Sequence, residues 1–232
     1  TPGDPGVYTC SGAMGNGDGD LNTTTTTNLL DVTVSPSTTF NVTSGDAFDL
    51  DSSAGITFTN NNSEVTISGA VDGINAYHDG TYGGALSITT TGTTTGGTTK
   101  NGIYARNKGI DLTINAATTM GGDNGIVAKN YGSGALSITT TGTTTGTNFD
   151  GIFAYNKSTG TSLTINAATT TGGDDGIVAR NYGTGALEIT TTGTTTGTAA
   201  EGIYAIMTNV ASTGDLTISA ANTEGGTYGI YA

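Results

Sequence analysis

Tryptophan is absent from the 232 residues, and cysteine, histidine and proline are scarce, with one, one and three copies. A single thiol, Cys10, cannot form a disulfide within the chain, so a disulfide framework is excluded as the basis of the fold. A single imidazole, His78, excludes metal sites built from several histidines and any Ser-His-Asp set that omits this residue. The sequence therefore offers few of the residue types from which active sites are built.

Charges and long apolar runs are also sparse. Charged side chains make up 11% of the chain, and 19 acidic residues against six basic ones give a net charge of −13. This balance disfavours nucleic acid as a partner, because phosphate binding depends on clustered Lys and Arg. No run of 18 apolar residues occurs, so we expect no membrane insertion of this chain.

Threonine and glycine are abundant, with 52 and 39 residues. Threonine favours β-strands, and glycine favours tight turns. Good helix formers such as Lys, Glu and Arg are scarce, and no segment has the 3.6-residue period of an amphipathic helix. The composition therefore predicts many short strands joined by turns.

Two short motifs alternate along most of the chain. Gly-Ile-x-Ala occurs seven times at intervals of 23 to 29 residues, and a Leu-x-Ile motif followed by a Thr-Gly tract lies between successive copies. Self-similarity at this period is typical of repeat architectures in which each unit stacks on its neighbours. The seven copies begin at Gly73, Gly102, Gly125, Gly151, Gly176, Gly202 and Gly229.

The repeat predicts an all-β fold. We expect a right-handed parallel β-helix (β-solenoid) of about eight to nine coils of roughly 26 residues, with three short strands in each coil. The coils span residues 21–232, and residues 1–20 form an N-terminal segment or cap. A leucine-rich repeat and a calcium-binding β-roll are weaker alternatives, because their consensus motifs are absent. A trimeric adhesin stalk stays open as an alternative, although such stalks usually have shorter repeats and a heptad segment.

Stacked coils bring equivalent residues into register, so each motif position becomes a stripe along the solenoid. The isoleucines of Gly-Ile-x-Ala are predicted to face the core. Asn107, Asn130, Asn156 and Asn181 are predicted to form a structural ladder of stacked amides, with His78 and Met207 at its two ends.

The outward positions next to the isoleucine stripe are unusual in composition. Five of the six basic residues fall there together with most of the aromatic residues of the repeats. We call this stripe the aromatic–basic band: Tyr77, Tyr104, Arg106, Lys108, Lys129, Tyr131, Phe153, Tyr155, Lys157, Arg180, Tyr182 and Tyr204. An acidic stripe is expected beside it, formed by Asp72, Asp123, Asp150, Asp175 and Glu201.

Two interpretations of the band remain open. Exposed aromatic and basic side chains are typical of an interface, but aromatic and β-branched pairs across strands also stabilise a sheet. The interface hypothesis predicts these partner-binding residues: Tyr104, Arg106, Lys129, Phe153, Tyr155, Arg180 and Tyr204.

The sequence predicts no enzyme, no cofactor and no metal site. The acidic stripe supplies one carboxylate per coil, which differs from the paired acid and base of a glycosidase. The Asp174-Asp175 pair is predicted to form a turn. Residues 16–20 begin like a calcium loop, but Thr27 stands where the loop requires a glutamate.

The repeats Gly102–Asn107, Leu163–Gly173 and Gly134–Gly142 resemble the passenger domains of Bartonella autotransporters, over residues 73–232. The resemblance implies export through the outer membrane and a secreted or cell-surface location. For the angiogenic members it implies binding of a host cell-surface receptor, a vascular endothelial growth factor receptor, and a mitogenic signal in endothelial cells. The alternative that the family also implies is a surface adhesin or autoaggregating stalk that binds matrix, glycans or itself.

The last repeat breaks off at Gly229–Ala232. We therefore expect a solenoid truncated at this end, with no membrane barrel in the chain. An open end presents unpaired backbone groups, which predicts concentration-dependent self-association end to end.

Overall fold

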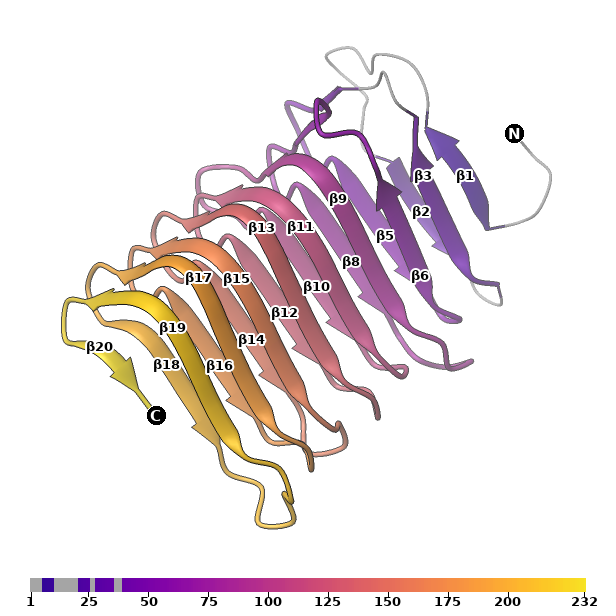
Figure 1. Cartoon of the computed structure of the whole chain (residues 1–232). Helices are drawn as coiled ribbons and strands as arrows, with labels where there is room; N and C mark the ends of the chain where they lie inside the picture. The colour runs from indigo at the N-terminus through magenta and orange to yellow at the C-terminus, as the bar shows by residue number, and fades with distance from the viewer. Residues whose placement is uncertain (1–5, 11–20, 26–27, 36–38) are drawn as a thin grey trace.

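The computed structural model describes residues 6–10, 21–25, 28–35 and 39–232, and it is a β-solenoid of about eight turns with about 26 residues per turn (Figure 1). The described residues contain strands and turns but no helix, so none of them forms a helix that could cross a membrane. The predicted all-β repeat architecture is confirmed. The calcium-loop reading of residues 16–20 and Thr27 falls outside the described residues.

Two parallel sheets run along the solenoid, one in front of the other in the view of Figure 1. The first has eleven strands: β1 (Val7–Cys10), β3 (Leu30–Val34), β6 (Ile56–Asn60), β9 (Leu86–Thr95), β11 (Leu112–Gly121), β13 (Leu136–Gly146), β15 (Leu163–Gly172), β17 (Leu187–Gly197) and β19 (Leu216–Gly225), in that order, with the short β4 (Phe40–Asn41) and β7 (Thr66–Ser68) beside this path. The second has nine strands: β2 (Leu21–Thr25), β5 (Phe48–Ser52), β8 (Ile74–His78), β10 (Ile103–Asn107), β12 (Ile126–Asn130), β14 (Ile152–Asn156), β16 (Ile177–Asn181), β18 (Glu201–Met207) and β20 (Tyr228–Tyr231).

The expected three separate strands per coil occur only near the N-terminus, where β5, β6 and β7 form one turn. From β9 onward the second and third segments join into one bent strand of 10 or 11 residues. The bend appears as a register irregularity, for example between Ala116 and Thr119 when β11 pairs with β13. The Leu-x-Ile segment and the Thr-Gly tract contain no proline, so every residue between them keeps a backbone N–H and the strand continues through the bend.

The core is built from in-register isoleucines, as predicted. Ile103 pairs with Ile126, Ile126 with Ile152, and Ile152 with Ile177, and all four are fully buried. Ile230 is the exception, because its side chain is 44% exposed. Among the described strands β20 pairs with β18 alone, so none of them covers the other side of Ile230, and the prediction that Ile230 lies in the core is wrong.

The glycine of each Gly-Ile-x-Ala motif is required by close packing. An inward threonine of the long strand, such as Thr170, places its methyl group against the backbone of Gly151, and a Cβ on Gly151 would lie 2.7 Å from the carbonyl oxygen of Gly176. Gly125 and Gly176 have the same environment, with Thr144 and Thr195 in the place of Thr170. The Thr-Gly tract and the Gly-Ile motif therefore form one packing unit.

Replacing Gly151 with alanine is expected to destabilise the fold by about 3 kcal/mol, because rigid backbone blocks the added methyl group. Gly229→Ala is the matched control at the same motif position, where the nearest atom to an added Cβ, Thr223 Oγ1, is 3.1 Å away. Thermal unfolding followed by circular dichroism measures both variants. Equal melting temperatures for the two would contradict this packing account.

The predicted asparagine ladder is present and fully buried. Asn107 Nδ2 donates to Asn130 Oδ1 at 2.9 Å, Asn130 Nδ2 to Asn156 Oδ1 at 3.0 Å, and Asn156 Nδ2 to Asn181 Oδ1 at 2.9 Å. His78 Nδ1 lies 2.6 Å from Asn107 Oδ1. Since that oxygen is an acceptor, the ladder makes His78 Nδ1 the donor. These amides and the imidazole have a structural role.

Candidate functional site

The aromatic–basic band lies on the outer face of the nine-stranded sheet. Tyr104, Val127 and Phe153 are consecutive partners across β10, β12 and β14, and Val178 and Tyr204 continue the column on β16 and β18. A second column beside it runs Tyr77, Arg106, Lys129, Tyr155 and Arg180. The structure therefore brings the seven predicted partner-binding residues together on one face, and all seven side chains are half-buried. Their role in binding stays a prediction.

Valines alternate with aromatic residues in the first column, and a cation two residues after each valine packs against the rings of the neighbouring strands. Lys129 Nζ lies 5.4 Å from the ring centre of Tyr104 and 5.7 Å from that of Phe153. Val127 below it is only 5% exposed, and Val178 is 3% exposed. Both valines point to the outer side of the sheet, but the neighbouring rings and the long cationic side chains leave them almost no contact with solvent.

Arg180 repeats this arrangement one double turn later. Its Cζ lies 5.6 Å from the ring centres of both Phe153 and Tyr204. Each cation therefore sits between two rings that belong to the preceding and the following strand. Such cation–π contacts contribute about 0.5–1 kcal/mol each at exposed sites.

The C-terminal ends of these strands carry a second set of ring contacts. Arg106 Cζ lies 5.4 Å from the ring centre of Tyr77 and 5.0 Å from that of Tyr131. Tyr155 contacts Tyr131 and Tyr182 with ring centres 5.6 and 5.4 Å apart. Burial, followed by the neighbouring tyrosines, raises the pKa of Tyr155. The band is thus a continuous packed layer, and its contacts stabilise the sheet whether or not a partner binds.

The acidic stripe differs from the prediction in one member. The residues that directly precede the glycine of the first six Gly-Ile-x-Ala motifs are Asp72, Asn101, Asn124, Asp150, Asp175 and Glu201. Asp123 lies one position earlier and stacks with Phe149, whose N–H donates to the Asp123 carbonyl at 3.2 Å. The prediction that Asp123 belongs to the stripe is wrong, because backbone hydrogen bonds between turns align positions by their distance from the glycine and not by charge.

The residues of the corrected stripe cap the turns of the next coil. The Asn101 N–H donates to Asp72 Oδ1 at 2.7 Å, the Asp150 N–H to Asn124 Oδ1 at 3.0 Å, and the Glu201 N–H to Asp175 Oδ1 at 2.7 Å. Side-chain oxygens of one turn thus accept hydrogen bonds from backbone N–H groups of the next turn that have no partner in the β-sheet. This arrangement explains acidic and amide residues at the stripe without a ligand.

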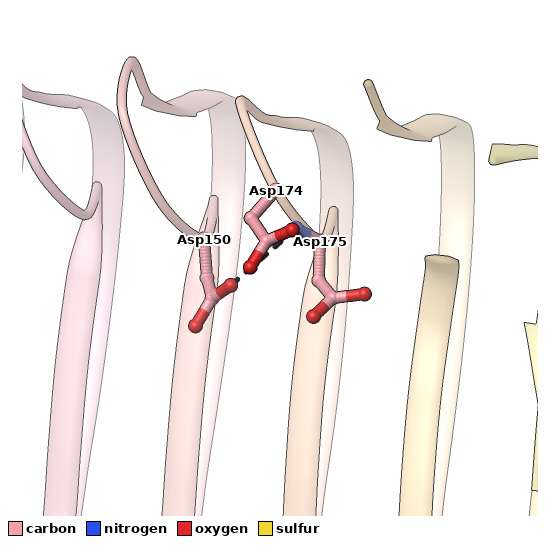
Figure 2. Close-up of side chains that lie close together, drawn as sticks. All are labelled: Asp150, Asp174 and Asp175. Carbon is pink, nitrogen blue, oxygen red and sulfur yellow. Dashed lines mark hydrogen bonds between the residues drawn. The ribbon is translucent and has the colours of Figure 1, made fainter. Parts of the chain in front are cut away.

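Asp174 adds a third carboxylate to two members of the stripe (Figure 2). Asp150, Asp174 and Asp175 each place a carboxylate oxygen within 4.8 Å of the other two. Oxygen ligands of this kind suit a hard divalent cation such as Ca²⁺, which was not predicted from the sequence. The sequence signal for this cluster was that Asp174 and Asp175 occupy the same turn positions as Phe149 and Asp150 in the preceding turn. The geometry alone does not establish a metal site, because the stripe already explains two of the three residues.

Crowding changes the protonation of this cluster. Burial, and next the charge of Asp175, raise the pKa of Asp150 to about 6. Burial also raises the pKa of Asp175. Because the folded chain holds the Asp150 proton more tightly than the unfolded chain, this carboxyl favours folding below about pH 4 and loses that contribution as the pH rises through about 6.

Replacing Asp150 with asparagine is therefore expected to raise the melting temperature near pH 7.5, with a difference that shrinks toward pH 4. The amide oxygen still accepts from the Asp175 N–H, which donates to Asp150 Oδ1 at 3.4 Å. Asp215→Asn, at an exposed residue, is the control. A lower melting temperature for the Asp150 variant at pH 7.5 would show that the carboxylate stabilises the turn.

A shallow hollow of about 270 Å³ lies between the band and the turns. It is lined by Asn124, Val127, Lys129, Phe149, Asp150, Phe153 and Asp174. Phe149, with 51% of its side chain exposed, was missed as a site residue in the sequence. The available signal was an aromatic residue at a turn position where neighbouring coils carry Lys100, Asp123 and Asp174.

Comparison with known proteins identifies no relative: no protein-family model, curated protein or solved structure matches the chain.

Proposed function

We propose that this chain is the binding part of a secreted or surface-displayed autotransporter-type protein, and that its aromatic–basic band engages a protein receptor on host cells. Following the Bartonella resemblance, the proposed receptor is one for vascular endothelial growth factor on endothelial cells, and binding stimulates proliferation. The solenoid acts by contact and not by chemistry.

One observation supports this proposal most directly. Five of the six basic residues and a continuous series of aromatic rings lie on one sheet face, whereas the outward positions of the long strands carry mostly threonine. Aromatic and arginine side chains dominate the binding energy of protein interfaces. From β8 to β18 the band covers five inter-strand spacings, about 24 Å, which is long enough for one receptor domain.

The cation–π contacts add a physical advantage for binding. Arg106, Lys129 and Arg180 are already positioned against rings, so they lose less conformational entropy when a partner covers them. Their charge favours an acidic receptor surface. The flanking carboxylates of Asp150 and Asp174 repel such a surface from the turns and orient it on the band.

The test is binding of the purified chain to the ectodomain of an endothelial growth factor receptor, followed by surface plasmon resonance, with proliferation of endothelial cells as the second readout. Saturable binding and proliferation are expected. Absence of both would overturn the receptor proposal. Attachment to matrix or to other copies of the chain, without receptor binding, would instead support the adhesin alternative.

A further inference from the structure

The hollow beside Val127 arises from a size difference within the first column of the band. Tyr104 and Phe153, the cross-strand partners of Val127, are larger than valine. Lys129, which lies against the Tyr104 ring, and the turn residues Phe149 and Asp150 line the hollow together with the valine. The resulting depression is open to solvent and has a floor of apolar side chains.

The lining combines three chemical types. Phe149 and Phe153 present aromatic surface, Asn124, Asp150 and Asp174 present planar groups with hydrogen-bonding oxygens, and Lys129 presents an ammonium donor. Pockets for drug-sized ligands measure about 300–1,000 Å³, so a hollow of about 270 Å³ fits one small ring. Four polar or charged side chains and three apolar ones line the hollow, so it offers both hydrogen-bonding groups and aromatic surface to orient a small ligand.

We propose that this hollow binds one neutral hexopyranose unit of a glycan. A pyranose has an apolar face of C–H groups, which packs on an aromatic ring, and adjacent hydroxyls, which donate to carboxylate and amide oxygens. This inference goes beyond the proposed receptor binding and does not depend on it.

Charge decides between neutral and acidic sugars. The hollow has two carboxylates, Asp150 and Asp174, and one ammonium group, and the chain as a whole carries −13. Sialylated or sulfated sugars would place a further anion against these carboxylates, which is unfavourable. The lysine, already placed against Tyr104 and Phe153, remains available as a donor to a hydroxyl.

The fold also disfavours a peptide in this position. Strands β12 and β14 each pair with a neighbour on both sides, so neither offers a free edge to an extended peptide. A peptide strand docks by backbone hydrogen bonds to such an edge. A compact ligand held by side chains is the occupant that the hollow accommodates.

The two-turn repeat supplies an internal control. The equivalent position one double turn later has Val178, Arg180 and Tyr204 in the places of Val127, Lys129 and Phe153. Ala200 stands there in the place of Phe149, because its N–H continues the same stack of turns by donating to the Asp174 carbonyl. The second position therefore lacks the exposed aromatic ring.

The experiment measures binding of methyl glycosides of glucose, galactose, mannose and N-acetylglucosamine, with sialic acid for comparison, by saturation-transfer NMR and titration. At least one neutral sugar is expected to bind. Phe149→Ala removes the exposed ring, and Val127→Phe fills the hollow, so each is expected to weaken binding at least tenfold. The matched control Val178→Phe is expected to leave the affinity within twofold, and circular dichroism verifies that all three variants fold.

No binding of any neutral sugar, unchanged affinity in both Phe149→Ala and Val127→Phe, or preference for sialic acid would overturn the proposal. Receptor binding is measured in parallel with Arg106→Glu, a residue outside the hollow. Loss of receptor binding with intact sugar binding separates the two proposals, as does the reverse result in Phe149→Ala.

Discussion

Replacing Ile152 with aspartate is expected to abolish cooperative folding of the central turns. Ile152 is fully buried and pairs with Ile126 and Ile177, which are also fully buried. A carboxylate there has no partner, and its burial costs more than about 4 kcal/mol, a large share of the stability of a typical domain. Because each coil is stable only through its neighbours, the loss spreads along the solenoid.

Circular dichroism and thermal unfolding measure this effect, and Ile230→Asp is the matched control. Ile230 occupies the same motif position but is 44% exposed, so its aspartate variant is expected to melt near the parent chain. If Ile152→Asp unfolded at the parental temperature, the isoleucine stripe would not be the core.

The repeat explains why so much of the fold could be predicted from the sequence. In a solenoid one motif position recurs in register, so a single inference about Ile103 also places Ile126, Ile152 and Ile177. The asparagine ladder was predictable for the same reason, namely that one motif position recurs in every coil. A buried side-chain amide has its hydrogen bonds satisfied when an identical amide lies above and below it.

The features that were missed depend on packing between unlike residues. Val127 and Val178 alternate in sequence with the core-facing residues on either side of them, so they point outward, and the cations Lys129 and Arg180 packed against the adjacent rings help to bury them. Asp123 was misplaced because two turns of different composition were aligned by charge. Ile230 was misplaced because a stripe position is buried only where a turn lies on both sides.

The alternation of valine and aromatic residues also links the two interpretations of the aromatic–basic band, as an interface and as a stabiliser of the sheet. Two kinds of coil alternate, so a ring and a gap follow each other along the solenoid, and the cations beside the gaps pack between the rings. Sheet stabilisation and partner binding therefore depend on the same side chains. A variant that removes them must be judged by folding and binding together.

A combined Arg106→Glu, Phe153→Ser and Arg180→Glu variant is expected to keep its β-sheet spectrum but lose receptor binding and mitogenic activity. The variant reverses two charges and removes the central ring, which Lys129 and Arg180 both contact. The variant loses five cation–π contacts of about 0.5–1 kcal/mol each, so it costs about 2.5–5 kcal/mol of stability and lowers the melting temperature while the β-sheet spectrum remains. Binding falls at least a hundredfold, because aromatic and arginine anchors contribute about 2 kcal/mol or more each.

The control for this variant lies on the eleven-stranded sheet. Thr91→Lys with Thr141→Lys adds two charges at exposed threonines of β9 and β13, away from the band, and is expected to change neither folding nor binding. Because Phe153 also lines the sugar hollow, Arg106→Glu alone is measured beside the triple variant to isolate the receptor face. If the threonine variant abolished activity while the triple variant retained it, the band would serve the sheet alone. The search for the receptor surface would then move to residues 1–62, which precede the regular repeats.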